Sequence, residues 1–388
     1  METTTAFSGL SCVDCGETFD DPALGRCPEC SGVLDAQYDL GSVALDDEGS
    51  MWAYEPVLPF AGSAAVSLGE GGTPLVEAPG LAEELGVNRV LIKDDGRNPT
   101  GTAVDRGLSL AVTPAGGEST VTLASTGDDA QSAAAYAARA GLPSESFVPT
   151  RAGFSRKAMV NVHGGEMSVV EGRLGDAVSA YRDAVEEHDD WHAVGAFDTP
   201  YRHEGLKTVL YEVVDDEFGV VPDAVIAPTG HGELLAGLGK AARELVDLGK
   251  APSMPRLYAA QAEGCAPIVR ALQEDHAVEP WDAPDTIAGA IEVPDPDPSG
   301  AQLAVDAVED TGGAGVTATD GDILDAALAV AEGVGVEMGV SGAVAAAGAW
   351  NLADEGAFAA DDTVVLLNTS QGNKDADVLR SRLMSRGI

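Results

Sequence analysis

The sequence predicts an α/β protein with mostly parallel, buried sheets, preceded by a small cysteine-rich module. Short apolar runs rich in β-branched residues alternate with segments of helical period along most of the chain. Strands buried on both faces of a parallel sheet have this continuous apolar pattern. Four cysteines in two close pairs lie within the first forty residues, and 388 residues are enough for two or three domains.

The apolar runs and the helical periods place the main elements along the chain. We expect strands at 90–92, 119–124, 167–170, 224–227, 257–260 and 363–367, and helices at 130–140, 175–187, 233–248 and 323–332. Between them, Glu292–Ser299 contains alternate prolines, which remove backbone donors and disfavour a helical conformation in the preceding residue. We therefore expect a loop at 292–299.

The composition is strongly acidic, with 64 Asp and Glu against 22 Lys and Arg and a formal net charge of −42. A field of this sign repels phosphate backbones and anionic membranes, which argues against a nucleic-acid or membrane partner. Acidic residues scattered along the whole chain are typical of a surface solvated at high salt. Because there is also no signal-peptide pattern and no long apolar run, we expect a soluble protein of a salt-adapted cytoplasm.

The two cysteine pairs have the spacing of a zinc ribbon. Cys12 and Cys15 form one pair and Cys27 and Cys30 the other, with eleven residues between the pairs. Each two-residue gap allows a tight turn to aim two thiolates at one ion, and four thiolates leave no open position, so the zinc would be structural. Two disulfides, or cysteines without a ligand, are the alternatives. Zinc ribbons also occur in nucleic-acid-binding proteins, but this segment holds a single arginine, Arg26.

Five motifs follow one another from Leu68 onward. They are Leu68-Gly-Glu-Gly-Gly-Thr-Pro-Leu75, Asn98-Pro-Thr-Gly101, Ser125-Thr126-Gly127 before an Ala-rich helix, Pro200-Tyr-Arg-His-Glu-Gly-Leu-Lys-Thr208, and Thr369-Ser-Gln-Gly-Asn-Lys-Asp375. In this order they resemble the motifs of the threonine synthase family of pyridoxal-phosphate (PLP) enzymes, some members of which also begin with a zinc ribbon. The resemblance implies the fold-type-II architecture, in which two parallel-sheet α/β sub-domains enclose a cleft. We expect the ribbon at 1–40, the catalytic-fold region at 41–388 and the smaller sub-domain at about 100–195.

The chain departs from the family pattern at the residue that would hold the cofactor. Where the family reads Ser-Phe-Lys-Asp-Arg-Gly, this chain reads Thr102-Ala-Val-Asp-Arg-Gly107, so that Val104 stands at the Schiff-base lysine position. The matching Asp105, Arg106 and Gly107 fix the register. Valine has no amine, so position 104 can neither form an imine with the cofactor nor transfer protons.

The resemblance also implies a phosphate-binding loop at Gly230-His231-Gly232-Glu233-Leu234, where the family reads Gly-Asn-Gly-Gly-Asn. Glycines there let backbone N–H groups approach a phosphate at a helix N-terminus. The carboxylate of Glu233 would lie beside that phosphate, and two like charges about 4 Å apart cost about 4 kcal/mol at an effective dielectric of 20. This repulsion corresponds to a loss of about a thousandfold in phosphate affinity.

Five further positions are implied by the family pattern. Asp128 replaces an asparagine that donates to the cofactor's ring oxygen, and a carboxylate cannot donate. Thr369 matches the threonine that faces the pyridine nitrogen. Ser125, Thr126 and Gly127 match the loop that binds the substrate carboxylate, so we expect a small anionic amino-acid ligand there, although Ser125 and Thr126 could equally be an N-cap pair.

Three residues could be proposed to replace the lost chemistry. Lys93 and Lys207 are candidate replacements for the Schiff-base lysine, but a lysine already belongs at both places in the family pattern, so neither is newly recruited. His231 lies beside Glu233 and could form a polar pair with it.

The sequence therefore predicts a threonine-synthase-like paralogue that has lost PLP chemistry and that binds an amino acid or regulates a partner. The rival hypothesis is an active threonine synthase, which converts phosphohomoserine to threonine. A nucleic-acid-binding ribbon protein is the third.

Overall fold

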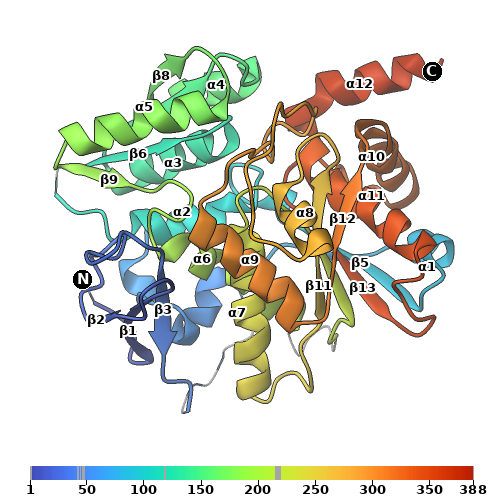
Figure 1. Ribbon diagram of the computed structural model, residues 1–388, viewed down its shortest axis with the longest axis horizontal. Coiled ribbons are helices and arrows are strands. Elements are labelled where there is room, and N and C mark those ends of the chain that lie inside the picture. The colour runs from blue at the N-terminus through green and yellow to red at the C-terminus, as the bar shows by residue number, and fades with distance from the viewer. Residues whose placement is uncertain are drawn as a thin grey trace. The chain divides into compact units, whose positions relative to one another are not determined.

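The computed structural model describes residues 2–41, 43, 45, 49–117, 119–214 and 220–387, and it divides into two compact units (Figure 1). Unit 1 consists of Met1–Gly72, Val104–Thr208 and Asp297–Gly300, and unit 2 of Thr73–Ala103, Val209–Pro296 and Ala301–Ile388. Each unit contains a largely parallel sheet, as the alternation of apolar runs and helical segments predicts.

Unit 1 contains a parallel four-stranded sheet in the order β8-β7-β6-β9. Its strands are β6 (Thr120–Ala124), β7 (Ser144–Pro149), β8 (Glu166–Val170) and β9 (Trp191–Ala193), and its helices are α2 (Val104–Val112), α3 (Asp128–Ala140), α4 (Phe154–Val162), α5 (Leu174–Glu187) and the first residues of α6 (Tyr201–Val213). Alternate strand residues point to opposite faces: Val121 and Leu123 pack against α3, whereas Phe147 packs against Ala177 and Tyr181 of α5.

The cysteine-rich segment of unit 1 forms a three-stranded antiparallel sheet in the order β2-β1-β3. Its strands are β1 (Phe7–Cys12), β2 (Thr18–Phe19) and β3 (Leu34–Tyr38), followed by the 3-10 helices η1 (Met51–Val57) and η2 (Gly62–Ala64). Leu10 and Leu34 share one hydrophobic cluster with Leu110 of α2 and Tyr201 of α6. The small sheet is therefore part of the packed interior of unit 1.

Unit 2 contains a six-stranded sheet in the order β12-β11-β10-β13-β5-β4, in which only β4 is antiparallel. The strands are β4 (Leu75–Glu77), β5 (Arg89–Asp94), β10 (Ala224–Pro228), β11 (Arg256–Ala262), β12 (Gly315–Ala318) and β13 (Thr363–Asn368). Because β5, β10 and β13 are parallel neighbours, the segments that follow them begin at one edge of the sheet.

Helices cover both faces of this sheet. They are α1 (Pro79–Leu85), α7 (Glu233–Asp247), α8 (Pro267–Glu274), α9 (Pro298–Asp310), α10 (Asp320–Val334), α11 (Val340–Asp354) and α12 (Ala376–Ser385), with the 3-10 turns η3 (Asp95–Arg97) and η4 (Gly372–Asp375). The alanine-rich helix α11 lies against β10, β12 and β13, and its buried alanines allow a close approach to the strands. Its core also includes Ile226 and Leu366.

The expected strands and helices are all present, with boundaries that differ by a few residues. One boundary corrects the sequence-based expectation. The loop predicted at 292–299 ends at Asp297, because Pro298 and Ser299 already belong to α9. Proline is accepted in the first turn of a helix, where its missing N–H would have had no partner.

Within the described part of the chain, no helix is long and apolar enough to cross a bilayer.

We expect the stability of this fold to rise steeply with salt. At a formal charge of −42, acidic groups repel one another at low ionic strength. Screening shortens the range of this repulsion from about 10 Å at 0.1 M to about 3 Å at 1 M salt. Thermal unfolding followed by circular dichroism across a KCl series tests this, and a melting temperature that stays constant up to molar KCl would contradict it.

Candidate functional site

Position 104 lies at the start of α2, on a backbone that close packing holds in place. Gly107 of α2 lies against the backbone of Arg202, and Gly205 of α6 lies against the backbone of Arg106. A side chain at either glycine would clash with the other helix, so the close approach of α2 and α6 depends on both glycines. Ser132 donates a hydrogen bond to Asp105, and Arg106 donates to Thr208 over 3.0 Å. The scaffold around position 104 is therefore retained, but its half-buried side chain is a valine without an amine.

The first of the five motifs contributes a buried carboxylate to unit 1. Glu70 is fully buried and accepts hydrogen bonds from the Trp52 indole at 2.7 Å, the Leu68 amide at 2.9 Å, Ser109 at 2.6 Å and Tyr136 at 2.7 Å. Burial, together with the carboxylates of Asp105 and Glu70, raises the pKa of Tyr136 far above its ordinary value, so its hydroxyl remains a donor. The bonds from Ser109 and Tyr136 connect the 68–72 loop to α2 and α3, and the bond from Trp52 connects it to η1.

The carboxylate-binding loop predicted at 125–128 connects β6 to α3. Gly127 has φ +133°, and its amide donates to the Ser125 hydroxyl over 2.9 Å. The Arg156 stem packs so closely on Gly127 that a Cβ at position 127 would come within 2.6 Å of it. Arg156 also donates from Nε to the Asp128 carboxylate at 2.9 Å. Asp128 is therefore held in an ion pair that covers the loop, and Thr126 is half-buried beside it.

The loop predicted to bind phosphate, Gly230–Leu234, covers the end of the turn between β10 and α7 and the first two residues of α7. Gly232 adopts φ +102° and Glu233 follows in the first turn of α7, with 6% of its surface exposed. A carboxylate in this turn already occupies the favourable field of the helix N-terminus, where a phosphate would have to lie. Gly230 is packed against Ile291 and Val293, at 3.4–3.5 Å from a Cβ built on it. The predicted phosphate loop therefore contains the buried acid Glu233 and packs against two apolar side chains, Ile291 and Val293.

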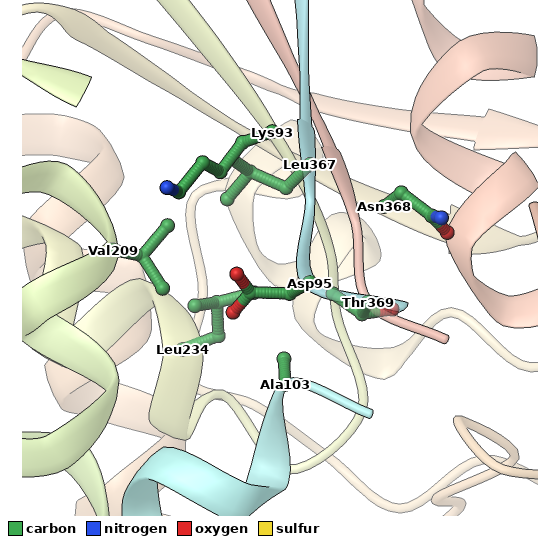
Figure 2. A pocket seen from close by; sticks show the side chains of 8 residues that line it. All are labelled: Lys93, Asp95, Ala103, Val209, Leu234, Leu367, Asn368 and Thr369. Atoms are coloured by element: carbon green, nitrogen blue, oxygen red, sulfur yellow. The ribbon is translucent and has the colours of Figure 1, made fainter. Parts of the chain in front are cut away.

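Three sequence-predicted residues of unit 2, Lys93, Leu234 and Thr369, line a small space together with residues that the sequence did not single out. Figure 2 shows Lys93, Asp95 and Leu367 directed toward Val209 and Leu234, with Ala103 and Thr369 below them and Asn368 pointing away. The space that these residues line is too small for a water molecule. Thr369 accepts a backbone hydrogen bond from Ala103 over 2.9 Å, and Leu234 occupies the position of the family's last loop asparagine.

Neither Lys93 nor Lys207 is arranged as a Schiff-base donor. Lys93 is 2% exposed and donates to Glu212 and to the carbonyl of Thr73, both at 2.6 Å. Lys207 is fully buried, lies 2.8 Å from Glu204 and stands 4.0 Å above the ring of Tyr38. Each ammonium group is thus held by a carboxylate partner rather than directed at an open space where a cofactor could lie.

The residues present do not fit covalently bound PLP. Position 104 lacks the amine, Glu233 puts a buried acid in the first turn of α7 directly after the predicted phosphate loop, and Asp128 is an acceptor paired with Arg156. The space around Thr369 is lined by both polar and aliphatic side chains and is too small for a water molecule. His231 is half-buried in the same loop and supplies no amine.

The four cysteines of the ribbon do fit a metal. Their Sγ atoms all lie within 4.8 Å of one another, with 3.5 Å between Cys12 and Cys30 and 3.7 Å between Cys15 and Cys27. Four sulfurs at 2.3 Å from a tetrahedral zinc ion would be separated by about 3.8 Å. All four are free thiols in this structure, so the disulfide alternative is not the arrangement observed. The cluster could hold one zinc ion.

Comparisons with known proteins agree with this fold. The family model described as "Pyridoxal-phosphate dependent enzyme" matches residues 66–370. Among solved structures, a fungal L-serine ammonia-lyase from Rhizomucor miehei superposes with a TM-score of 0.68 at 19% identity, covering 80% of this chain and 97% of that one. Maize serine racemase gives a TM-score of 0.69 at 19% identity, covering 81% and 94%. The fold is that of the fold-type-II PLP enzymes.

Two relatives indicate to which family of the fold-type-II PLP enzymes the chain belongs. Threonine synthase of Methanosarcina acetivorans is 35% identical over 94% of this chain and 92% of its own length. Threonine synthase of Methanocaldococcus jannaschii is 33% identical over 94% and 93%. The chain belongs to the threonine synthase family of PLP-dependent enzymes.

Sequence reasoning missed the partners of the altered residues. Arg156 lies 28 positions after Asp128, and Ile291 and Val293 lie some sixty positions after Gly230. The sequence did contain a pattern that could have pointed to Arg156 as an ion-pair partner. The 151–163 segment has three basic residues and no acidic one, in a strongly acidic chain. Nothing in the sequence indicated which apolar residues would pack on Gly230.

The Arg156–Asp128 pair gives a testable stability effect. Arg156→Ala leaves a carboxylate with 5% exposure without its cation, so we expect a loss of about 2 kcal/mol in unfolding free energy, somewhat below the cost for a fully buried pair. Arg156→Ala with Asp128→Asn should recover part of this loss. Urea unfolding measures both, with exposed Arg151→Ala as the control. Equal stability of wild type and Arg156→Ala would show that the pair contributes nothing.

Proposed function

We propose that this protein is a threonine-synthase-like paralogue that has lost PLP chemistry and acts as an amino-acid-binding or regulatory protein. The observation that carries the proposal is the valine at position 104. Its side chain has no amine, so this position cannot form the imine on which the family's chemistry depends. Buried Glu233 and the Arg156–Asp128 pair support it independently, since each opposes a different contact that the cofactor would need.

The proposed ligand site is the loop at Ser125, Thr126 and Gly127. The loop leads into the N-terminus of α3, where backbone N–H groups favour a carboxylate, and Arg156 adds a cation beside it. A small anionic amino acid fits this donor set. The carboxylate of the ligand would replace the Asp128 carboxylate as the ion-pair partner of the Arg156 guanidinium.

An absorbance spectrum tests the loss of cofactor chemistry. We expect no aldimine band in the purified protein and none after PLP is added. Calorimetric titration of L-homoserine and of phosphohomoserine tests the ligand site, and Thr126→Ala should weaken binding of whichever compound binds. An aldimine band that appears with added PLP would overturn the first part of the proposal, and binding unaffected by Thr126→Ala would overturn the second.

A second candidate is an active threonine synthase, which the similarity to threonine synthases over nearly the whole chain favours. Release of inorganic phosphate from phosphohomoserine distinguishes the two. We expect no release above the rate without protein, whereas turnover that depends on added PLP would establish the enzyme.

A further inference from the structure

Unit 2 contains an open cavity that belongs to none of the family motifs. It is lined by residues of α10 and α11 and by Arg386, which follows α12, and it has a volume of about 280 Å³. This volume approaches the lower end of the range for small-molecule sites. The lining residues are Asp322, Asp325, Ala326, Ala329, Ala347, Trp350, Asn351 and Arg386.

One half of the cavity is apolar. Ala326 and Ala347 are buried and Ala329 is exposed, so the small side chains of α10 and α11 form a shallow floor. Trp350 stands beside them, and its indole donates to Glu84 over 3.1 Å, which fixes the orientation of the ring. An aliphatic group placed there would contact methyl groups and an aromatic ring.

The other half carries charged groups of both signs, Asp322, Asp325 and Arg386. Asp325 accepts two hydrogen bonds from Arg382, at 2.7 and 2.6 Å, and one from Arg386 at 2.5 Å. The two guanidinium groups, Arg382 foremost, lower the pKa of Asp325 to about 2, so this carboxylate is ionised at neutral pH. With Asp322 in the same lining, the two arginines and two carboxylates sum to no net charge, which suits a ligand that itself carries one charge of each sign. Among the described residues, Asp325 is the only side-chain partner of Arg386, whose Nε and Nη1 can bind another anion.

Two acceptors face this cationic group from the same lining. Asp322 uses Oδ2 to accept from Thr319 at 2.6 Å, which leaves Oδ1. Asn351 uses its amide nitrogen to donate to the Thr317 carbonyl at 2.8 Å, which leaves its carbonyl oxygen. A carboxylate and an amide oxygen together suit an ammonium group, which has three donors and no acceptor.

We propose that this cavity binds a free α-amino acid with a small aliphatic side chain. The α-carboxylate binds Arg386, the α-ammonium binds Asp322 and Asn351, and the side chain packs on the alanine floor beside Trp350. The site is separate from the 125–128 loop, and its occupancy does not depend on the function proposed for that loop.

Calorimetric titration with L-valine tests the proposal, with valinol and isovalerate as probes that lack one charge each. We expect L-valine to bind and both analogues to bind at least tenfold more weakly. Arg386→Ala should weaken L-valine binding at least tenfold, and Arg386→Lys should restore part of it. Arg380→Ala, an exposed position of α12, is the control. Ala329→Leu fills the floor from an exposed position and should also reduce binding.

Three results would overturn it. They are no binding of L-valine at millimolar concentration, equal binding of valinol or isovalerate, or unchanged affinity in both Arg386→Ala and Ala329→Leu. If Thr126→Ala abolishes valine binding while these variants do not, the ligand binds the 125–128 loop, and the cavity assignment fails while the proposed function stands.

Discussion

Replacing Val104 with lysine will not by itself allow the protein to capture PLP. The variant gains the amine, and the packing of Gly107 and Gly205 should present it at the start of α2. The phosphate anchor, however, still contains the buried Glu233 carboxylate. A repulsion of about 4 kcal/mol corresponds to about a thousandfold in affinity, so little cofactor should be retained at micromolar concentration.

A graded set of variants separates the missing groups. Covalent capture should require at least Val104→Lys with Glu233→Gly, and turnover should further require Asp128→Asn, which restores a donor for the cofactor's ring oxygen. Val104→Met has a similar length but no amine and serves as the control. The aldimine absorbance of each variant is the measurement. A full band in Val104→Lys alone would show that Glu233 and the apolar contacts on Gly230 do not oppose the phosphate.

Removal of metal from the ribbon should have the second large effect. The purified protein should contain about one zinc per chain, and a change of any one of the four cysteines should abolish it. Structural zinc contributes about 10–16 kcal/mol of apparent binding free energy in small zinc-dependent modules, so the ribbon should unfold without it. Cys265→Ala, at a buried cysteine outside the cluster, should retain zinc and serves as the control.

The loss of structure that follows removal of zinc should extend beyond the ribbon into α6. Asp35 of β3 accepts from His203 at 2.9 Å, and Tyr38 donates to Glu204 at 2.6 Å. Arg26 lies 2.8 Å from Asp297 and 3.5 Å from Asp198. Hydrogen exchange should therefore speed up at 201–204 as well as at 7–38 in the Cys15→Ser variant. Disulfides found by thiol titration, with no zinc by metal analysis, would contradict the assignment.

Much of the fold could be predicted because it depends on local pattern. The apolar run at 224–227 is a central strand with parallel neighbours on both sides, and such strands are apolar on both faces. The helix at 233–248 begins at the predicted residue because the glycine before it adopts a positive φ. The ribbon followed from the two-residue spacing of its cysteines alone.

The environment of the altered residues could not be predicted, because it depends on contacts between distant segments. The sequence locates Glu233 in the loop but does not determine whether its side chain is exposed to solvent. In the structure this side chain is buried. Asp128 was identified as a lost donor, but its pairing with Arg156 depends on where α4 packs. The space around Thr369 is closed by Leu234 and Ala103, which come from separate elements of unit 2.

Borohydride reduction of the unmodified protein in the presence of PLP, followed by peptide mass spectrometry, tests the central claim most directly. A lysine that formed an imine with PLP would be trapped as a phosphopyridoxyl adduct. Because Val104 has no amine and Lys93 and Lys207 are held in ion pairs, we expect none of these positions to carry the adduct, and no release of phosphate from phosphohomoserine. A stoichiometric adduct on one lysine, together with such release, would contradict the account.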